Sequence, residues 1–167
     1  LMVVDMPKDT YKNSKIAKKN VKKVMKLTRC EAIKIESNNN NFDVIKKLVK
    51  EKIPVMGHIG YTPQFKKKFK VEGSTLSSAK KLMKEALLVQ KAGAFSIVLE
   101  CVDAKIAKKI TKKLTIPTIG IGSSRFCDGQ ILVTDDMIGL SGFYPKFVKK
   151  YVNLSRIIEK AVKKYTS

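Results

Sequence analysis

Short apolar segments alternate with longer amphipathic stretches along the whole chain, and this alternation restricts the fold more than any other feature of the sequence. Each apolar segment contains, or runs into, a side chain capable of polar chemistry. The segments are Leu1–Met6, Ala32–Glu36, Ile53–Met56, Ser96–Glu100, Pro117–Gly122 and Ile131–Val133. Strands and helices in regular alternation predict an α/β fold with a parallel sheet. Because the carboxyl ends of parallel strands meet at one edge, the polar side chains predict one shared site.

The stretches between these segments predict helices, because their apolar residues recur at helical spacing. The expected ranges are Ser14–Leu27, Phe42–Lys50, Ser74–Lys91, Asp103–Leu114, Lys146–Tyr151 and Leu154–Tyr165. Asp103 is expected to cap its helix. On the last helix we expect a buried stripe formed by Ile157, Ile158, Ala161 and Val162. The run Asn38–Asn41 predicts a loop that also supplies a helix cap.

A chain of 167 residues with 44% hydrophobic composition is long enough for one core. It is too short for a complete (β/α)₈ barrel, which takes about 250 residues. The chain also opens at Leu1, inside an apolar strand-like run. We therefore interpret residues 1–167 as a single domain, a partial barrel that is the carboxyl-terminal part of a longer enzyme.

The sequence contains no apolar stretch of about 18 residues and no secretory signal, so we expect neither a membrane partner nor export. The cysteines, Cys30, Cys101 and Cys127, are widely spaced and form no CxxC pair. This pattern favours reduced thiols and a cytoplasmic location.

A net charge of +21 is the usual electrostatic signature of a nucleic-acid binder. The lysines, however, come mostly as pairs on the predicted outer faces of helices, and the chain has no tryptophan. Only the run Phe65–Lys70 interleaves aromatic rings with charge. We interpret most of this charge as a solvated coat and expect no nucleic-acid partner, with a basic nucleic-acid-binding protein kept as the alternative.

Asp5 and Glu36 each close a predicted strand, and two carboxylates brought to one edge of a sheet either repel or share a cation. A hard ion such as magnesium prefers such oxygen ligands. The alternative is that either acid caps the following helix. Lys34 lies two residues before Glu36, on the same face of the strand, where it would bind an anionic substrate.

The string GHIGYTPQ, residues 57–64, is the most distinctive in the chain and holds its one histidine, His58. The glycines permit close backbone approach and the proline fixes a turn. His58 is therefore either an active group or a satisfied structural one. Glu100 ends an apolar run, and a partly desolvated carboxylate in such a place is suited to act as a general base.

Taken in order, the strings LMVVDMP, AIKIES, GHIGYTPQ, KVEG, SIVLECV, IPTIGIG, CDGQILVTDDMIGL and PKFVKKY closely resemble the ketopantoate hydroxymethyltransferase family. The resemblance covers essentially the whole chain. It implies a (β/α)₈ TIM barrel of the phosphoenolpyruvate/pyruvate superfamily, of which about strands 3 to 8 are present here. It also implies a cytoplasmic homo-oligomer, commonly a decamer.

The family's reaction transfers a hydroxymethyl group from 5,10-methylenetetrahydrofolate to 3-methyl-2-oxobutanoate and gives 2-dehydropantoate, through a metal-stabilised enolate. By resemblance, Glu100 is the proton acceptor, Asp5 and Glu36 are metal ligands for one magnesium ion, and Asp5, Lys34 and His58 are substrate-binding residues.

The chain departs from the family at Asp103 and at Ser123, Ser124 and Arg125, which affects loops rather than ligands. The family's early GDS motif is expected upstream of Leu1, and without it the site is incomplete and this segment alone inactive. Two alternatives remain: another lyase or mutase of the same superfamily, and a catalytically inactive truncated homologue.

Overall fold

The computed structural model describes residues 1–37 and 41–167. Backbone contacts divide the chain into two compact units, Leu1–Gln130 and Ile131–Ser167. The interpretation of residues 1–167 as a single domain stays a prediction. Of the predicted loop and cap at Asn38–Asn41, residues 38–40 lie outside the described residues, and Asn41 occupies the N-cap position of a helix.

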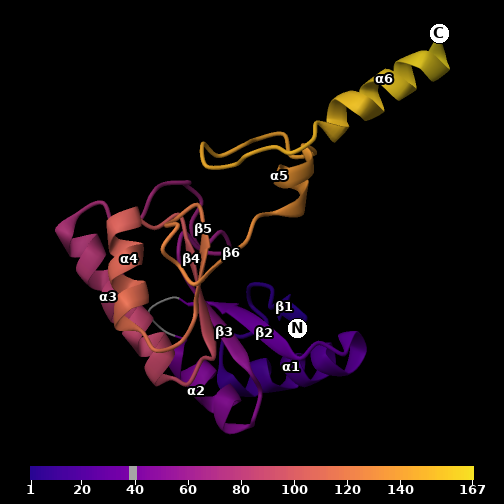
Figure 1. The fold of residues 1–167 in the computed structure, drawn as a ribbon. Helices are drawn as coiled ribbons and strands as arrows, with labels where there is room; N and C mark the ends of the chain where they lie inside the picture. Colours follow the sequence, from indigo (N-terminus) through magenta and orange to yellow (C-terminus); the bar gives the residue numbers. More distant parts are fainter. Residues whose placement is uncertain (38–40) are drawn as a thin grey trace. The chain divides into compact units, whose positions relative to one another are not determined.

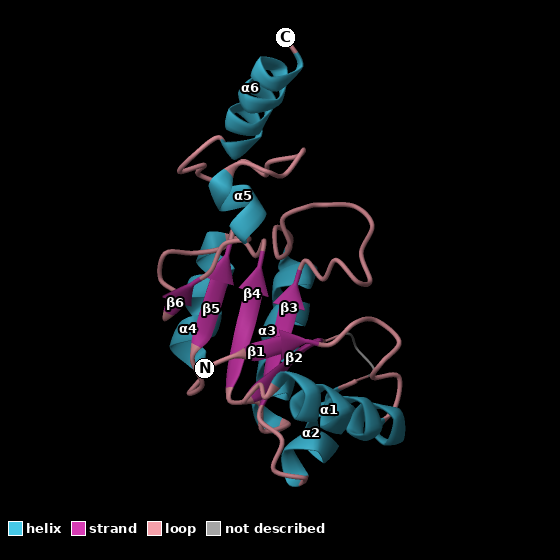
Figure 2. Ribbon diagram, turned by 90° about the vertical axis from the view of Figure 1, so that its right-hand side faces the viewer, coloured by secondary structure: helices cyan, strands magenta, loops and turns pink. Residues whose placement is uncertain are grey.

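The first unit contains one parallel six-stranded sheet whose strands follow sequence order. The strands are β1 (Val3–Asp5), β2 (Ala32–Glu36), β3 (Val55–Gly60), β4 (Ser96–Glu100), β5 (Thr118–Ile121) and β6 (Gly129–Gln130). The connecting helices are α1 (Ser14–Thr28), α2 (Phe42–Lys50), α3 (Leu76–Lys91) and α4 (Ala104–Lys113). The sheet curls into a half-barrel with these helices on its outer side (Figure 1), and Figure 2 shows the strands from the open side. The α/β architecture is therefore confirmed.

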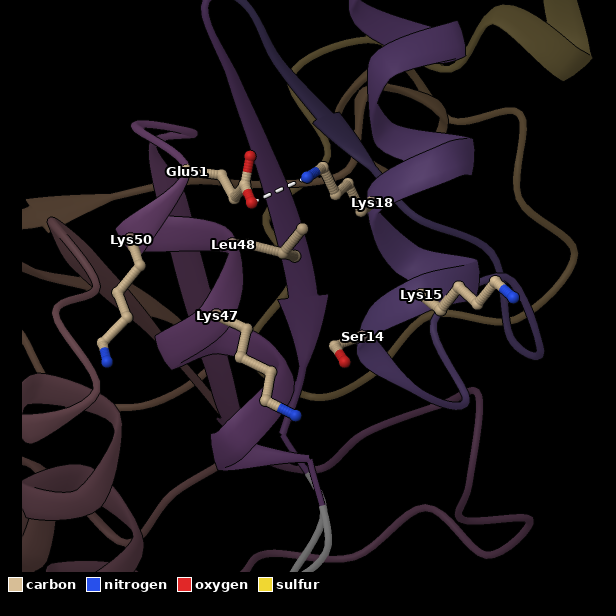
Figure 3. A pocket seen from close by; sticks show the side chains of 7 residues that line it. All are labelled: Ser14, Lys15, Lys18, Lys47, Leu48, Lys50 and Glu51. Carbon is tan, nitrogen blue, oxygen red and sulfur yellow. Dashed lines mark hydrogen bonds and ion pairs between the residues drawn. The ribbon is translucent and has the colours of Figure 1, made fainter.

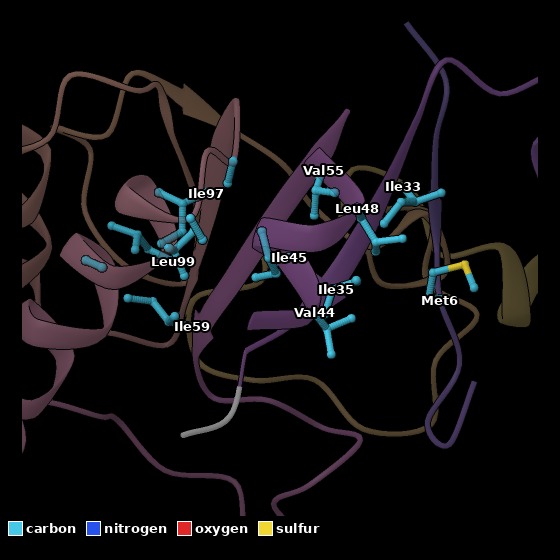
Figure 4. Packing of buried hydrophobic residues seen from close by; sticks show 14 of the residues in the cluster. Met6, Ile33, Ile35, Val44, Ile45, Leu48, Val55, Ile59, Ile97 and Leu99 are labelled. Atoms are coloured by element: carbon cyan, nitrogen blue, oxygen red, sulfur yellow. The ribbon is translucent and has the colours of Figure 1, made fainter. Parts of the chain in front are cut away.

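Strand residues alternate between the two faces of the sheet. Ile33, Ile35, Ile59, Ile97 and Leu99 belong to the buried core. Figure 4 shows this core packed between the strands and Val44, Ile45 and Leu48 of α2. Burying each such aliphatic side chain contributes about 1.5–3 kcal/mol. The intervening strand residues consequently face the inside of the half-barrel.

Side chains at the helix ends explain where several helices begin. Asn13 accepts a hydrogen bond from the Ile16 N–H at 2.9 Å and caps α1. Asp103 accepts from the N–H groups of Lys105 and Ile106 at 3.0 and 3.2 Å, which confirms the predicted cap of α4. Each side chain satisfies backbone donors that have no partner inside the helix.

The sixth strand was predicted at Ile131–Val133, and this prediction is wrong. β6 is formed two residues earlier, where Gly129 and Gln130 pair with Ile119 and Gly120 of β5. Ile131 and Val133 are each 50% exposed and begin the second compact unit. Their apolar character therefore does not mark a place in the sheet.

The second unit contains α5 (Thr134–Ile138) and α6 (Leu154–Thr166). The helix predicted at Lys146–Tyr151 is absent from this described segment. Instead, the Pro145 carbonyl accepts from the Val148 N–H in a single turn, and the Tyr151 N–H donates to the Met137 carbonyl. With these partners the backbone cannot form the regular i to i−4 bonds of a helix.

The helix predicted at the end of the chain is present as α6, but its apolar stripe is not buried. Ile157, Ile158 and Val162 are 54%, 48% and 55% exposed. An amphipathic pattern identifies a helix without supplying the surface that covers it.

Candidate active site

Three carboxylates predicted from the sequence end three strands of the half-barrel. Asp5 is the last residue of β1, Glu36 of β2 and Glu100 of β4. The strand predicted at Ile53–Met56 instead covers Val55–Gly60, so that His58 lies inside β3 and pairs in register with Glu36. Parallel strands bring these residues to one edge, so the predicted shared site exists as a cluster.

Lys34 connects Asp5 with His58 in this cluster. Its Nζ lies 3.0 Å from Oδ2 of Asp5 and 3.3 Å from Nδ1 of His58. On the far side of the ring, Nε2 of His58 lies 3.2 Å from Oε2 of Glu100. The side chains therefore form a continuous polar chain from Asp5 through Lys34 and His58 to Glu100.

The contacts of His58 fix its tautomer. A lysine ammonium has only donors, so Nδ1 of His58 must accept from Lys34. Burial lowers the pKa of His58, and the charge of Lys34 lowers it further, against the opposing effect of Glu100. The neutral ring then carries its proton on Nε2, which faces Glu100.

The Nε2–H of His58 is nevertheless incompletely satisfied. Although Oε2 of Glu100 is 3.2 Å away, the contact lacks hydrogen-bond geometry, and Nε2 has no hydrogen-bond partner among the described residues. The pair is therefore an electrostatic contact. A buried donor in this state leaves room for a small shift of Glu100 toward the ring.

Glu36 is 1% exposed and carries the most perturbed carboxyl of the cluster. Burial raises its pKa to about 7, and the negative charges of Asp5 and Glu100 add to the rise. Its Oε2 accepts the backbone N–H of Gln64 at 3.0 Å, which opposes the rise, as does Lys34. Its Oε1 lies 3.9 Å from Nδ1 of His58.

The donor set at Asp5 and Glu36 fits a magnesium ion. The described residues contain no group of three or more His, Cys, Asp or Glu side chains that could hold a metal alone. Two carboxylates are nevertheless what magnesium commonly takes from a protein, since it keeps several waters and binds substrate oxygens as well. Asp5 is close enough for its charge to raise the pKa of Glu36, and a cation beside them would offset that repulsion.

Two glycines of β3 determine how closely other segments approach the sheet edge that carries the cluster, called here the catalytic edge. A Cβ on Gly57 would collide with the Val89 side chain of α3, so this glycine lets the helix approach the strand. Gly60 has φ +96 and passes against the Glu100 carbonyl, which accepts the Tyr61 N–H at 2.7 Å. The close approach expected of the GHIG glycines is therefore confirmed.

The residue after Glu100 turns the chain abruptly. Cys101 has φ 51, in the left-handed region that non-glycine residues rarely occupy, and its N–H donates to the Ile121 carbonyl at 2.9 Å. Ser123 makes two further hydrogen bonds here. Its Oγ donates to the Leu99 carbonyl at 2.6 Å and accepts the Val102 N–H at 3.0 Å. These contacts fix the direction in which Glu100 leaves β4.

Several polar residues near predicted strands have structural partners. Oδ2 of Asp128 accepts from the N–H and the hydroxyl of Thr118 at 2.8 and 2.9 Å, at the amino end of β5. Asp136, in α5, accepts from the Ser141 hydroxyl.

Cys30, Cys101 and Cys127 are all buried and free of disulfides.

A hollow of about 370 Å³ lies on the outer, helical side of the first unit (Figure 3). It is lined by residues of α1, of α2 and of the position just after α2: Ser14, Lys15, Lys18, Lys47, Leu48, Lys50 and Glu51. None of the predicted site residues lines it. Lys18 and Glu51 form a salt bridge of 2.7 Å across it, which is consistent with a solvated basic surface.

The curled parallel sheet, with carboxylates at three of its strand ends, is an α/β architecture consistent with an incomplete TIM barrel. The family model for ketopantoate hydroxymethyltransferase matches residues 1–167, and the chain belongs to this family. In the part of the chain that the structure describes, no helix is long and apolar enough to cross a bilayer.

Named relatives agree with this family. A 3-methyl-2-oxobutanoate hydroxymethyltransferase of Pelagibacter ubique is 50% identical over 99% of this chain and 64% of its own length. Proteins of the same name from Syntrophomonas wolfei and Francisella tularensis are 44% and 48% identical over 99% and 98% of this chain. The chain spans 62% and 64% of their respective lengths.

Sequence reasoning missed two residues of the cluster. Gln64 stands at the end of the GHIGYTPQ string without an assigned role, and Tyr11 carries no sequence signal at all. Gln64 donates its backbone N–H to Glu36, and Tyr11 donates its hydroxyl to Gln64.

Proposed function

We propose that the protein transfers a hydroxymethyl group from 5,10-methylenetetrahydrofolate to 3-methyl-2-oxobutanoate and forms 2-dehydropantoate, a reaction of pantothenate biosynthesis. The observation that carries this proposal is the polar chain from Asp5 through Lys34 and His58 to Glu100. This chain supports the proposal, because a cation, a neutral ring and a carboxylate that could act as a base lie next to one another. The names of the relatives agree with this reaction.

Glu100 is the general base of the proposed reaction. Its side chain is 18% exposed, so it can reach a ligand while remaining shielded from bulk water. It removes the proton from carbon three of the 2-oxo acid. The resulting enolate forms a carbon–carbon bond to the methylene carbon of the folate as one of the two carbon–nitrogen bonds of that carbon breaks. Water then replaces the second carbon–nitrogen bond: its oxygen becomes the hydroxyl of 2-dehydropantoate, and the folate nitrogens take up the protons to give tetrahydrofolate.

Asp5 and Glu36 would hold one magnesium ion at the ends of β1 and β2. When bound, magnesium compensates the negative charge that develops on the keto oxygen. Lys34 is 20% exposed and offsets the charge of the substrate carboxylate. His58 would contact the substrate beside Lys34, and its Nε2–H, 3.2 Å from Oε2 of Glu100, would stabilise the charge of that carboxylate.

The wider setting follows the family. We propose a (β/α)₈ barrel of the phosphoenolpyruvate/pyruvate superfamily with strands 3 to 8 in this segment, a cytoplasmic homo-oligomer such as a decamer, and no nucleic-acid or membrane partner. The lysine-rich run Phe65–Lys70 follows β3 at the catalytic edge and would attract a folate tail bearing several carboxylates.

The test uses the protein produced from its complete coding sequence, called here the full gene product. Incubation with 3-methyl-2-oxobutanoate and magnesium in deuterated water should replace the carbon-three proton, as followed by NMR. Adding 5,10-methylenetetrahydrofolate should then yield 2-dehydropantoate. A protein that binds the 2-oxo acid but neither exchanges this proton nor forms product would contradict the proposal.

A further inference from the structure

Gln64 connects the two strand ends that carry Asp5 and Glu36. Its backbone N–H donates to Oε2 of Glu36 at 3.0 Å. Its side-chain Nε2 donates to the carbonyl of Met6, the residue after Asp5, also at 3.0 Å. One residue of the β3–α3 loop thus contacts the carboxylate of one strand and the backbone of another.

The orientation of the Gln64 amide is fixed by its partners. The Met6 carbonyl only accepts, so the NH₂ group must face it. The other end of the amide, Oε1, accepts the hydroxyl of Tyr11 at 2.8 Å. Tyr11 is 3% exposed, and its ring packs edge-on against Phe65, with ring centroids 6.4 Å apart. A buried, doubly held ring is a rigid anchor for the amide.

The Met6 backbone is itself part of the sheet edge, because its N–H donates to the Lys34 carbonyl at 3.0 Å. Movement of Gln64 would therefore displace both the backbone that follows Asp5 and the Glu36 carboxylate.

We propose that Gln64 is a positioning residue that sets the separation of the Asp5 and Glu36 carboxylates, with Tyr11 as its anchor. This inference rests on the proposed function in one respect, namely that these two carboxylates hold a divalent cation. Gln64 does not itself touch the cation. It acts through Glu36 and through the backbone of Met6, as residues beyond the direct ligands commonly do in metal sites.

Two near-isosteric variants of the full gene product test the proposal. Gln64→Met keeps the backbone N–H and the length of the side chain but removes both amide contacts. Tyr11→Phe removes only the anchoring hydroxyl and leaves every charge unchanged. The matched control is Gln90→Met, because Gln90 in α3 accepts the N–H of Thr115 at 2.7 Å, away from the catalytic edge.

The first measurement is the dissociation constant of Mn²⁺, which also prefers oxygen ligands and whose free form is counted by its EPR signal. We expect Gln64→Met to weaken binding about tenfold or more, the usual range for such supporting residues. Tyr11→Phe should weaken it less, and should add nothing in the Gln64→Met background. Gln90→Met should bind as the wild type does, even if its melting temperature falls.

The second measurement needs no metal. Hydrogen exchange of the backbone N–H at position 64 should be faster in Gln64→Met and Tyr11→Phe than in the wild type. It should be unchanged in Gln90→Met. Unchanged exchange in Gln64→Met overturns the proposal, as do wild-type Mn²⁺ affinity in that variant or additive effects of the two substitutions. A wild-type protein that binds no Mn²⁺ instead refutes the cation of the proposed function, and the exchange rates still decide whether Gln64 anchors Glu36.

Discussion

The contact between Nδ1 of His58 and Lys34 limits the proton chemistry that the ring can perform. Nδ1 accepts from Lys34, so the ring has no lone pair available to take a substrate proton. Glu100 is the carboxylate that faces the other nitrogen and remains partly accessible. In the proposed reaction, Glu100 would therefore be the base and His58 would support it.

Substitution of Glu100 in the full gene product should separate proton transfer from binding. Glu100→Gln keeps size and shape but cannot accept a proton, so carbon-three exchange of 3-methyl-2-oxobutanoate should slow by about a hundredfold or more. Magnesium-dependent binding of the 2-oxo acid, measured by calorimetry, should survive. Asp5→Asn should instead weaken binding first, because it removes a negative ligand from a hard-ion site. Unchanged exchange in Glu100→Gln would transfer the role of base to another group.

Glu85 of α3 gives a prediction about stability and pH. Burial raises its pKa above the ordinary value of 4.5, although Lys81 and Lys66 oppose the rise. A carboxyl whose pKa is raised in the folded state favours folding below pH 4.5 and loses that contribution as pH rises through the folded value.

Glu85→Gln should therefore be more stable than the wild type at pH 7, and the difference should vanish below pH 4. Urea unfolding of both proteins at the two pH values measures it. Equal stability at pH 7 would mean that Lys81, 3.8 Å away, compensates the burial of the charge.

At the scale of elements, the fit of α3 against β3 depends on a missing side chain. The side chain of Val89 packs directly against the backbone of Gly57, and a Cβ there would collide with Cγ1 of Val89. Gly57 pairs in register with Ile35 and Ile97 on the neighbouring strands. The next residue along β3 is His58, so displacement of this strand would also displace the ring that faces Glu100.

Gly57→Ala should destabilise the full gene product by about 1–3 kcal/mol, the usual cost of overpacking a core. Val89→Ala in the same protein removes the colliding methyl groups and should recover part of this loss. Chemical unfolding of the single and double variants measures both effects. A double variant whose loss equals the sum of the single losses would show that the two residues do not interact.

At the scale of the whole chain, the six-stranded sheet remains open. β1 pairs only with β2, and β6 only with β5, among the described residues. Exposed backbone at such edges can pair with another molecule. The net charge of +21 opposes this association by repulsion and falls mostly on helical surfaces such as the hollow of Figure 3.

A polypeptide of residues 1–167 expressed by itself should therefore self-associate and lack hydroxymethyltransferase activity, because closed barrels have no free edges. Light scattering and the proton-exchange assay test the two parts. The full gene product, measured beside it, should be well behaved and active. A monomeric, cooperatively unfolding and active 167-residue polypeptide would refute this expectation.

The charge predicts weak, sequence-independent binding of the full gene product to duplex DNA. Non-specific dissociation constants on the order of micromolar or worse are typical at physiological salt, and affinity falls steeply as salt rises. A salt titration with two unrelated duplexes measures this. Tight binding to one sequence would favour the nucleic-acid-binding alternative.

The sequence alone determined the α/β class and the position of Asp5, Glu36 and Glu100 at strand ends. This was possible because helical and strand periodicities are local, and because parallel strands necessarily bring their carboxyl ends together. The strings LMVVDMP, AIKIES and SIVLECV, which contribute to the family resemblance, also lie in these segments.

Only the tertiary structure decided which side chains meet. The two contacts of Lys34 and the bridge made by Gln64 depend on strand register and loop path, which no local pattern encodes. The same reason explains the shifted β6 and the exposed stripe of α6: apolar character shows that burial is favourable, whereas backbone pairing and a covering surface come from residues distant in sequence.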